Sequence, residues 1–253
     1  MLSKNIALVT GASAGFGKAI ALQLVQDGYK VIASARREDK LKNLASLYPE
    51  DIFPLKLDVS KPLTLQETLD SLPENFQTID VLINNAGLAL GIKPVPHIDL
   101  NDWDQMIDTN IRGLIHLTQF IVKGMIERKK GHIVSLSSIA GTYPYLGGNV
   151  YGASKAFVTQ FMLNLKVDLL KTPIKLTTIE PGLTSGTEFS EVRLKDKEQA
   201  QAVYANVDAL TAEDIAKTVS WILGLPDHVN INRIEMMPVC QAPGGLTVSK
   251  TTD

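Results

Sequence analysis

The feature that most constrains the fold is a regular alternation between short apolar runs and longer amphipathic segments. The runs expected to form buried strands are residues 6–9, 31–35, 53–57, 81–83, 132–136, 176–179 and 231–236. Segments with helical spacing of apolar residues lie between them, at residues 19–25, 40–47, 65–72, 103–126, 150–170 and 212–223. A connection of helix length between two strands makes a crossover, so the strands are expected to be parallel and covered on both faces.

The length of the chain and its uniform composition indicate one domain. A chain of 253 residues is common for a single α/β domain. No linker, repeat or break in composition divides it, and 45% hydrophobic residues suffice for a sizeable core. We therefore predict one domain over residues 1–253, an α/β, Rossmann-type, doubly wound parallel sheet with helices on both faces.

Charge and composition argue against several classes of partner. The net charge of -2 gives no general attraction to nucleic acid or to an anionic membrane. No apolar run is long enough to span a membrane, and the apolar start of the chain is too short for a signal peptide. The single cysteine, Cys240, fits a reducing compartment. The four histidines are scattered, so no metal site is expected. We expect a cytoplasmic protein with a small-molecule ligand.

A glycine-rich turn at residues 10–17 lies directly between the first strand and the first helix. Backbone N–H groups at a helix start bind negative charge, and glycine lets the backbone approach a ligand closely. The spacing G-x-x-x-G-x-G differs from the general dinucleotide fingerprint. A plain tight connection is the alternative interpretation, but the position favours pyrophosphate binding. The residues expected to bind it are Gly11, Ser13, Gly15, Phe16 and Gly17.

The end of the second strand indicates which dinucleotide is bound. An acidic residue there would hold the 2′-hydroxyl of NAD, whereas arginine accommodates the 2′-phosphate of NADP. Here the strand continues into Arg36 and Arg37, and no carboxylate precedes Glu38. Two guanidinium groups can form bidentate, charge-assisted hydrogen bonds to a phosphate. A solvated pair at a helix start is the alternative; the adjacent turn favours NADP.

Tyr151 and Lys155 are the best candidates for proton transfer. Residues four apart share a face of a helix, so both side chains can point into one site. A nearby ammonium group is expected to lower the pKa of the phenol, which can then act as general base in oxidation and general acid in reduction. Many surface helices contain such a pair, so the pair alone has little specificity.

Neighbouring strand ends supply the rest of the site. Ser138 follows the fifth strand, Asn85 and Gly87 follow the fourth, and Pro181 and Gly182 follow the sixth. Ligands of open α/β sheets bind outside the carboxyl ends of the strands, where all these residues are expected to meet. The Ser138 hydroxyl can donate to a substrate oxygen and stabilise its developing charge.

These motifs together resemble the short-chain dehydrogenase/reductase family over residues 10–239. The matching residues are Gly11, Gly15, Gly17, Asn84, Asn85, Ala86, Gly87, Asn110, Ser138, Tyr151, Lys155, Pro181 and Gly182. The resemblance implies a catalytic tetrad of Asn110, Ser138, Tyr151 and Lys155. In it Tyr151 exchanges the proton and Ser138 orients the carbonyl, while Lys155 binds ribose and tunes Tyr151. Asn110 holds a water of the proton relay.

The same resemblance extends the cofactor site and implies a homotetramer. Asp58 and Val59, after the third strand, match the pair that contacts adenine, and Asn85 matches the wall of the nicotinamide-ribose site. Further residues expected to line the cofactor site are Gly87, Tyr151, Lys155, Pro181, Gly182, Thr184 and Thr187.

A narrower resemblance concerns the substrate. Segments 15–17, 85–91, 147–152, 179–183, 186–190 and 230–239 resemble the NADP-dependent 3-hydroxy acid dehydrogenases, which include serine and allo-threonine dehydrogenases. Ser185 and the tail after Cys240 depart from that pattern. The resemblance implies oxidation of the 3-hydroxyl of small acids such as serine, allo-threonine and 3-hydroxypropionate.

Arg193 is the candidate partner for the carboxylate of such a substrate. It lies in a segment after the sixth strand where this fold carries a substrate lid. A solvated lid arginine is the alternative interpretation. The expected substrate contacts are Ser138, Tyr151 and Arg193.

Two other functions stay open at this point. A reductase of other small ketones, aldehydes or oxoacyl thioesters would use the same fold, cofactor and tetrad. A protein that senses NADP without catalysis would need no proton-transfer pair, so the presence of Ser138, Tyr151 and Lys155 argues against it.

Overall fold

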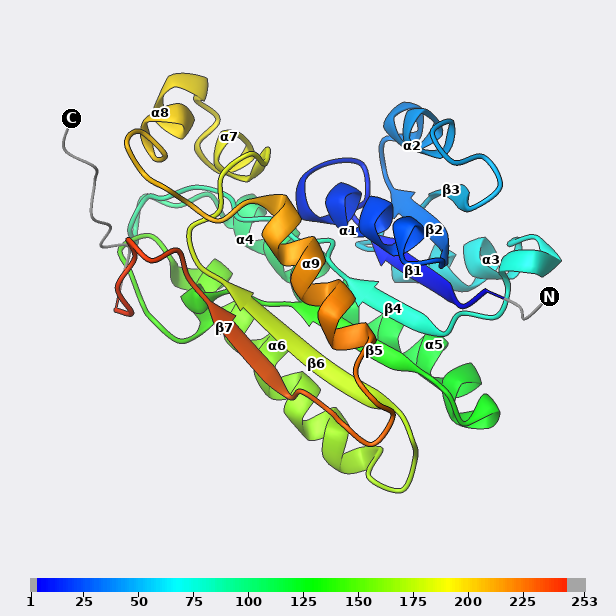
Figure 1. Ribbon diagram of the computed structural model, residues 1–253. Helices are drawn as coiled ribbons and strands as arrows, with labels where there is room; N and C mark the ends of the chain where they lie inside the picture. Colours follow the sequence, from blue (N-terminus) through cyan, green and yellow to red (C-terminus); the bar gives the residue numbers. More distant parts are fainter. Residues whose placement is uncertain (1–3, 245–253) are drawn as a thin grey trace.

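In the part of the chain that the structure describes, seven strands form one sheet in which every neighbouring pair is parallel (Figure 1). The computed structural model describes residues 4–244. The sheet order is β3-β2-β1-β4-β5-β6-β7. The strands are β1 Ile6–Thr10, β2 Lys30–Ala35, β3 Ile52–Lys56, β4 Val81–Asn84, β5 His132–Leu136, β6 Lys175–Pro181 and β7 Arg233–Met236. The predicted α/β parallel sheet is confirmed, and its order reverses between β1 and β4.

Helices cover both faces of this sheet, as the sequence predicts. Helices α1, α2 and α9 pack on one face, and α3, α5 and α6 pack on the other (Figure 1). The α-helices are α1 Gly15–Gln26, α2 Glu38–Ala45, α3 Leu65–Asp70, α4 Leu100–Ile107, α5 Leu114–Arg128, α6 Asn149–Asp168, α7 Phe189–Leu194, α8 Lys197–Ala202 and α9 Ala212–Leu223. Short helical turns are η1 Pro62–Thr64, η2 Glu74–Phe76, η3 Asp108–Gly113 and η4 Ile139–Gly141.

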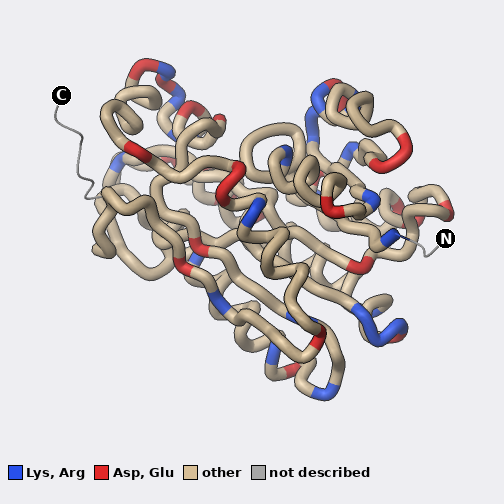
Figure 2. The backbone as a smooth tube through the Cα atoms, in the orientation of Figure 1, with Lys and Arg blue, Asp and Glu red and all other residues tan. Residues whose placement is uncertain are grey.

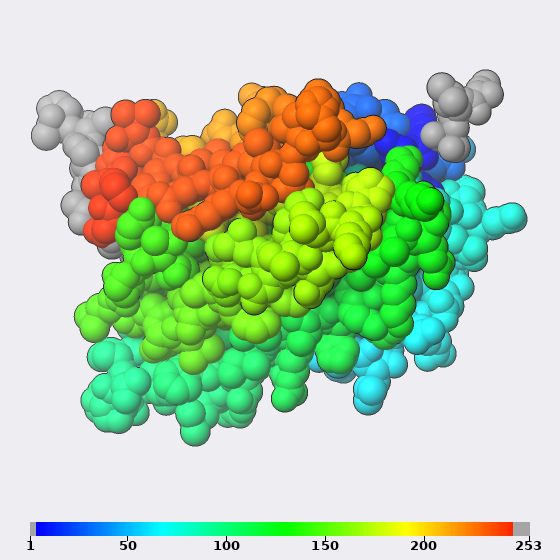
Figure 3. Space-filling model, turned by 90° about the horizontal axis from the view of Figure 1, so that it is seen from below, coloured from blue at the N-terminus to red at the C-terminus, as the bar shows by residue number. Residues whose placement is uncertain are grey.

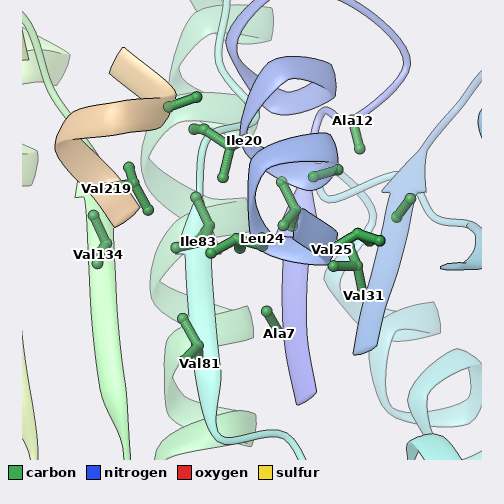
Figure 4. Close-up of a cluster of buried hydrophobic side chains, with 14 of the residues drawn as sticks. Ala7, Ala12, Ile20, Leu24, Val25, Val31, Val81, Ile83, Val134 and Val219 are labelled. Carbon is green, nitrogen blue, oxygen red and sulfur yellow. The ribbon is translucent and has the colours of Figure 1, made fainter. Parts of the chain in front are cut away.

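Successive residues of each buried strand belong to hydrophobic cores on opposite faces of the sheet. On one side Ala7 and Ile83 meet Leu24 of α1 and Val219 of α9 (Figure 4). Leu8, the next residue of β1, belongs to the core under the opposite layer of helices. Successive side chains of a strand point to opposite faces, so apolar strands of this kind require helices on both.

The helix expected over residues 103–126 differs from the prediction. The helical segment runs from α4 to α5, but residues Asp108–Gly113 form a π-helix in the middle of it. A π-helix has i→i+5 hydrogen bonds and often marks a functional site. Gly113 ends it where a Cβ atom would lie 2.6 Å from the carbonyl oxygen of Val59, so only glycine fits. The hydrophobic spacing does not reveal this change of helix type.

The last strand begins two residues later than expected. The predicted strand covered residues 231–236, whereas β7 begins at Arg233. The side chain of Asn230 explains the difference, because it accepts from Leu176 N at 2.8 Å and donates to Leu176 O at 3.0 Å. Viewed from below (Figure 3), the β7 segment lies along the margin of the molecule beside residues of β6 and α6.

Residues 182–211, called the lid below, connect β6 to α9 and contain α7 and α8. These helices lie beyond the carboxyl ends of the strands (Figure 1). Asp196 caps α8 by accepting hydrogen bonds from the backbone of Glu198 and Gln199. A capping box between Thr211 and Asp214 fixes the point where the lid enters α9. The lid therefore has defined ends and secondary structure of its own.

Charged residues of both signs alternate along the chain, and no element carries only one sign over a long stretch (Figure 2). Within residues 4–244, no helix combines the length and the apolar character that crossing a membrane requires. The part of the tail beyond residue 244, whose sequence departs from the 3-hydroxy acid dehydrogenase pattern, lies outside the described residues.

Candidate active site

A cleft of about 830 Å³ opens at the carboxyl ends of the strands, below the lid. Most of the predicted site residues line it: Gly11, Ser13, Gly15, Phe16, Arg36, Arg37, Asp58, Val59, Asn85, Gly87, Ser138, Tyr151, Lys155, Pro181, Gly182, Thr184, Thr187 and Arg193. Gly17 and Asn110 lie one layer behind this lining. The cleft includes the switch point between β1 and β4, the general location of ligand sites in open α/β sheets.

The glycine-rich turn joins β1 to α1 with a geometry that needs its glycines. Gly11 and Gly15 have φ angles of +68° and +51°, which lie in the left-handed region that favours glycine. Gly17 is needed for another reason, since a Cβ atom there would collide with the carbonyl oxygen of Gly11. Gly17 therefore allows the start of α1 to pack closely against the carbonyl of Gly11.

The start of α1 is suited to an anion. Ala14 is its N-cap residue and provides no side-chain hydrogen bond. The first N–H groups of a helix have no partner within the helix, and its dipole favours negative charge at this end. Gly15 and Phe16 bring these groups to the cleft wall. The arrangement fits the pyrophosphate of a dinucleotide.

Cations gather beyond this helix start, at the end of β2. Arg37 donates from Nη2 to the hydroxyl of Ser13 at 2.9 Å and forms an ion pair with Glu188 of the lid at 2.7 Å. Lys40 pairs with the other oxygen of Glu188 at 2.7 Å. Arg36 lines the same part of the cleft. Two arginines and a serine hydroxyl together fit a phosphate group.

The middle of the cleft floor is held by hydrogen bonds between strand ends. Asn85 donates from its side chain to Thr10 O at 2.7 Å, and its backbone N–H donates to the Thr10 hydroxyl at 3.0 Å. Asp58 accepts from the backbone and the hydroxyl of Ser60. These bonds fix the walls predicted to contact ribose and adenine.

Three of the four tetrad residues converge on one part of the cleft. Tyr151 and Lys155 lie on α6 and are buried, and Lys155 Nζ lies 5.8 Å from the centroid of the Tyr151 ring. Lys155 Nζ also donates to Leu136 O at 2.8 Å, which ties the helix to the end of β5. The Ser138 oxygen accepts from Ala140 N at 3.1 Å, so the serine is fixed as the cap of η4.

The pKa of the Tyr151 phenol differs from the expectation. Burial raises it to about 12, while the Ser138 hydroxyl acts in the opposite direction and Arg193 opposes burial as well. Burial also lowers the pKa of Lys155 to about 8. The predicted lowering of the phenol pKa by Lys155 is therefore wrong. The depth of burial, which outweighs the nearby charges, cannot be read from the sequence.

Asn110 does not line the cleft but holds residues that do in place by hydrogen bonds. It lies in the π-helix, buried, where its side chain accepts from Leu88 N and donates to Leu88 O, both at 2.9 Å. It also donates to the Ser154 hydroxyl at 3.0 Å. A Cβ atom at Gly87 would lie 3.3 Å from Asn110 Oδ1 and 3.4 Å from Lys155 Nζ. The Asn110 side chain thus fixes the segment that passes beside Lys155.

Arg193 reaches into the cleft from α7. Its Nε donates to Gly91 O at 3.3 Å, and its guanidinium lies 5.0 Å from the Tyr145 ring centroid and 5.8 Å from that of Tyr151. Arg193 Nη2 and the Tyr145 hydroxyl are both buried, and neither has a well-formed hydrogen bond to any described residue. Burial raises the pKa of Tyr145, and the adjacent guanidinium opposes that change. This neutral phenol and this cation are available to a ligand.

Several lining residues were missed by sequence reasoning. Tyr145 belongs to no motif that points to chemistry; only its place just before the glycine pair at residues 147–148 could have drawn attention to it. Phe189, whose ring centroid lies 5.6 Å from that of Tyr151, was quoted only as part of a family segment. Other apolar residues that complete the wall are Leu88, Ile92, Leu146 and Val192.

No three His, Cys, Asp or Glu side chains within residues 4–244 are placed to hold a metal ion. The sheet reversal, the uncapped helix start and a Ser-Tyr-Lys set facing the same cleft define a dinucleotide-dependent oxidoreductase. The family model of the short chain dehydrogenases matches residues 5–198, and the chain belongs to this family.

Curated relatives and a solved structure match the chain over nearly its whole length. The NADP-dependent 3-hydroxy acid dehydrogenase YdfG of Salmonella typhi is 52% identical over 247 residues, which cover 97% of this chain and 100% of the relative. The serine 3-dehydrogenase of Rhizobium radiobacter is 44% identical over 242 residues, with coverage of 95% and 96%. A closed form of serine dehydrogenase complexed with NADP+ is 50% identical, has a TM-score of 0.93, and is matched over 97% of this chain and 100% of that chain.

Proposed function

We propose that this enzyme oxidises the 3-hydroxyl of short 3-hydroxy acids, and reduces the matching carbonyl compounds, with NADP as cofactor. Serine, allo-threonine and 3-hydroxypropionate are the proposed substrates. The observation that carries this proposal is Arg193, a half-buried cation whose guanidinium lies 5.8 Å from the Tyr151 ring centroid and whose buried Nη2 has no hydrogen-bond partner among the described residues. The names of the 3-hydroxy acid and serine dehydrogenases to which the chain is similar support it.

NADP is the cofactor of the chain. Among the relatives, the Salmonella typhi enzyme is named NADP-dependent, and the matched serine dehydrogenase structure is complexed with NADP+. We propose that Arg36, Arg37 and Ser13 bind the 2′-phosphate and that the start of α1 binds the pyrophosphate. Losing one charge-assisted contact in Arg37→Met or Arg36→Met should weaken NADP binding by roughly ten- to a hundred-fold. NAD binding should stay within about twofold, and equal losses for both cofactors would contradict the assignment.

The proposed proton chemistry follows from the states of Tyr151 and Lys155. The nicotinamide supplies hydride transfer when bound, and its oxidised ring is positively charged. In the reductive direction the neutral Tyr151 phenol donates its proton to the carbonyl oxygen, while the Ser138 hydroxyl donates a hydrogen bond to the same oxygen. In oxidation the phenolate form of Tyr151 takes the proton of the substrate hydroxyl. Arg193 acts to lower the pKa of the Tyr151 phenol and so stabilises this phenolate, while Lys155, at the same distance from the ring, is proposed to bind the ribose.

The cleft offers hydrogen-bond donors at the position that the substrate carboxylate would occupy. When the 3-hydroxyl lies between Ser138 and Tyr151, the carboxylate extends two carbons further, toward the lid. There the Arg193 guanidinium and the Tyr145 hydroxyl can both donate to it. A partly buried carboxylate needs such partners, since its removal from water is otherwise costly. Arg193 and Tyr145 therefore form the proposed carboxylate site.

The decisive experiment compares a 3-hydroxy acid with its methyl ester. In Arg193→Met the KM of the acid should rise by about ten- to a hundred-fold, while the KM of the ester changes by less than about threefold. Lys195→Met is the matched control, because Lys195 is another lid cation but faces Asp102 at 3.5 Å on the exposed surface. An equal rise for acid and ester in Arg193→Met would show that the arginine supports only the lid.

A second candidate function is supported by the apolar wall. Ile92, Phe189 and Val192 offer neutral ketones or oxoacyl thioesters a surface beside the same Ser138 and Tyr151. A panel of serine, allo-threonine, 3-hydroxypropionate, simple ketones and an oxoacyl thioester decides between the two. Good turnover of neutral carbonyl compounds with poor turnover of every 3-hydroxy acid would favour the second.

We further propose a cytoplasmic homotetramer built from single domains that each contain both sites. Exposed apolar residues on and just after α6, among them Phe157, Leu163 and Val167, support an interface on that helix. The single cysteine, Cys240, supports a reducing compartment. Sedimentation equilibrium should give the mass of four chains, and Val167→Glu should lower it.

A further inference from the structure

Glu180 is a buried carboxylate that takes no part in the proposed proton transfer. It is the last residue but one of β6 and is completely buried. Its neighbour Ile179 belongs to the core under α1 and α9, and successive side chains of a strand alternate between faces, so Glu180 points toward the face that α6 covers. A carboxylate is costly to bury and persists only with well-placed partners. The partners of Glu180 therefore indicate what it does.

One carboxylate oxygen of Glu180 holds α6. Oε1 accepts a hydrogen bond at 2.8 Å from the hydroxyl of Thr159, which lies one helical turn beyond Lys155. The Thr159 hydroxyl also lies 3.1 Å from that of Ser137, which donates to Lys155 O at 2.7 Å. Ser137 directly precedes Ser138. Glu180 is thus connected to the turn of α6 that begins at Lys155.

The other oxygen holds η4 through an arginine on the neighbouring strand. Oε2 forms an ion pair with Nη2 of Arg233 on β7, the edge strand beside β6 (Figure 1). The same nitrogen donates to the Thr142 hydroxyl at 2.7 Å, and Thr142 follows η4 directly. Ser138 is the N-cap of that helical turn. The side chain of Arg233 is 40% exposed, so the buried charge of Glu180 is paired from the surface.

We propose that Glu180 is a positioning residue that sets the separation between the Ser138 hydroxyl and the Tyr151 phenol. It acts through a continuous chain of polar contacts, called the Glu180 bridge below: Thr142, Arg233, Glu180 and Thr159. One end of the bridge is fixed to the turn that Ser138 caps, and the other to the helix that carries Tyr151. None of its four residues lines the cleft. The inference rests on the roles given to Ser138 and Tyr151 under the proposed function.

The bridge fixes two elements whose backbones meet directly. A Cβ atom at Gly141 of η4 would lie 2.7 Å from Ala156 N, and one at Gly152 of α6 would lie 2.8 Å from Ala140 O. Glycines let the two backbones approach, but they provide no side chains that interlock and prevent sliding. Groups that act on one substrate oxygen tolerate little misplacement, since an error of about 1 Å can cost about 10²-fold in rate. The bridge supplies directional contacts that hold η4 and α6 in register.

The first test cuts the bridge at either end and leaves the ion pair of Glu180 intact. In Thr142→Val and in Thr159→Val, kcat should fall by about three- to tenfold, measured with the substrate that the unmodified enzyme turns over fastest. The KM for NADP should change by less than about twofold, because the glycine-rich turn is untouched. Thr218→Val is the matched control: like Thr159, Thr218 lies on a helix within hydrogen-bond distance of the carbonyl four residues earlier, but on α9.

The double variant Thr142→Val/Thr159→Val shows whether the two threonines act as one connection. A bridge that is cut once no longer positions either element. The kcat of the double variant should therefore equal, within about twofold, that of the slower single variant. Two independent contributions would instead multiply and lower kcat by about ten- to a hundred-fold.

The pH dependence of oxidation gives a readout that a purely structural role would not change. Burial raises the pKa of the Tyr151 phenol, and its hydrogen bond with Ser138 acts against burial. Thr159→Val changes no charge, and it leaves in place the other groups that face the phenol: Arg193, Tyr145 and Lys155. A weaker bond from Ser138 raises the phenol pKa. The pH of half-maximal oxidation rate should therefore rise by about 0.3–1 unit in Thr159→Val and stay constant in Thr218→Val.

Three results would overturn the proposal: unchanged kcat in both single variants, multiplied effects in the double variant, or an unshifted pH profile in Thr159→Val. A lower free energy of unfolding without those changes would make the bridge a stabilising contact and nothing more. The assignment beneath the proposal is tested separately by Ser138→Ala and Tyr151→Phe. If these two variants keep full turnover, the catalytic assignment itself is wrong. If they lose turnover while the threonine variants keep it, only the positioning role of Glu180 is wrong.

Discussion

The catalytic face of the cleft and the lid above it are held in different ways. On the catalytic face, side chains are tied to the backbone of neighbouring strands. Lys155 donates to Leu136 O, Asn85 donates to Thr10 O, and the Asn110 amide bonds both backbone groups of Leu88. All three residues lie among the buried strand ends or on helices packed against them. This region can move only when the sheet itself opens.

The lid depends instead on contacts at its margins. Its helices α7 and α8 have six residues each, too few to be stable alone. The ion pairs of Glu188 and the bond from Arg193 to Gly91 O anchor them to the rest of the protein, and a bond between Ser190 and Tyr204 joins α7 to the segment after α8 within the lid. The proton-transfer groups Tyr151 and Lys155 are therefore fixed by the fold. Arg193, the proposed partner of the substrate carboxylate, is carried on a segment that can open separately.

The largest expected effect is on the catalytic face. Tyr151→Phe keeps the ring and its packing on Phe189 but removes the acid/base oxygen, so kcat should fall by at least about 10²-fold. Cofactor affinity should be nearly unchanged, because the glycine-rich turn and Lys155 are intact. Steady-state turnover and a cofactor titration measure the two quantities. Turnover near that of the unmodified enzyme would remove Tyr151 from the mechanism.

The second prediction tests whether the sheet unfolds as one unit in acid. His132 on β5 is buried and bonded to Thr177, and burial lowers its pKa to about 3. The unfolded chain binds a proton near pH 6.5, the folded chain only near pH 3. Stability is therefore lost as the pH falls below about 6.5. Between pH 6.5 and 4.5 the unmodified protein should lose about 2–3 kcal/mol more unfolding free energy than His132→Gln.

Urea unfolding at the two pH values gives this difference directly. His116→Gln is the control, since it makes the same substitution at an exposed position on α5. If the stability of His132→Gln depends on pH as strongly as that of the unmodified protein, the surroundings of His132 must open to water before the sheet unfolds.

The third prediction concerns the turn where the two regions meet. In Gly17→Ala the added methyl group meets the carbonyl of Gly11, so the turn must shift at a cost of about 1–3 kcal/mol. NADP affinity should fall by roughly ten- to a hundred-fold while Tyr151 stays in place. Gly224→Ala is the control, because a Cβ atom there meets no atom closer than 3.5 Å. Unchanged NADP affinity in Gly17→Ala would show that the turn adapts freely.

The sequence predicts the catalytic face much better than it predicts the lid. Strands made of continuous apolar runs leave one arrangement of the sheet, and that arrangement brings Asn85, Ser138 and Tyr151 to one edge. The helices of the lid have six residues each and are held by tertiary contacts, so they are too short to show a periodic pattern of apolar residues. The place of Tyr145 in the cleft and the ion pairs of Glu188 are likewise tertiary contacts that no local pattern predicts. Burial decides the pKa of Tyr151, and burial depends on the folded lid.

The smallest expected effect tests the independence of the lid. Tyr204→Phe removes the 2.7 Å bond between the Tyr204 and Ser190 hydroxyls, which links the segment just after α8 to α7. One such bond contributes about 1 kcal/mol, so local opening, and with it amide exchange over residues 189–194, should increase about fivefold. The free energy of global unfolding in urea should not change, because the lid opens before the sheet.

Tyr143→Phe is the matched control for this experiment. It removes a tyrosine hydroxyl bonded to Glu235 at 3.1 Å, on β7 rather than on the lid, and should leave exchange over residues 189–194 as it was. If Tyr204→Phe lowers the global unfolding free energy by the full 1 kcal/mol and leaves local exchange unchanged, the lid folds and unfolds together with the sheet. The distinction between a fixed catalytic face and a separately opening lid would then fail.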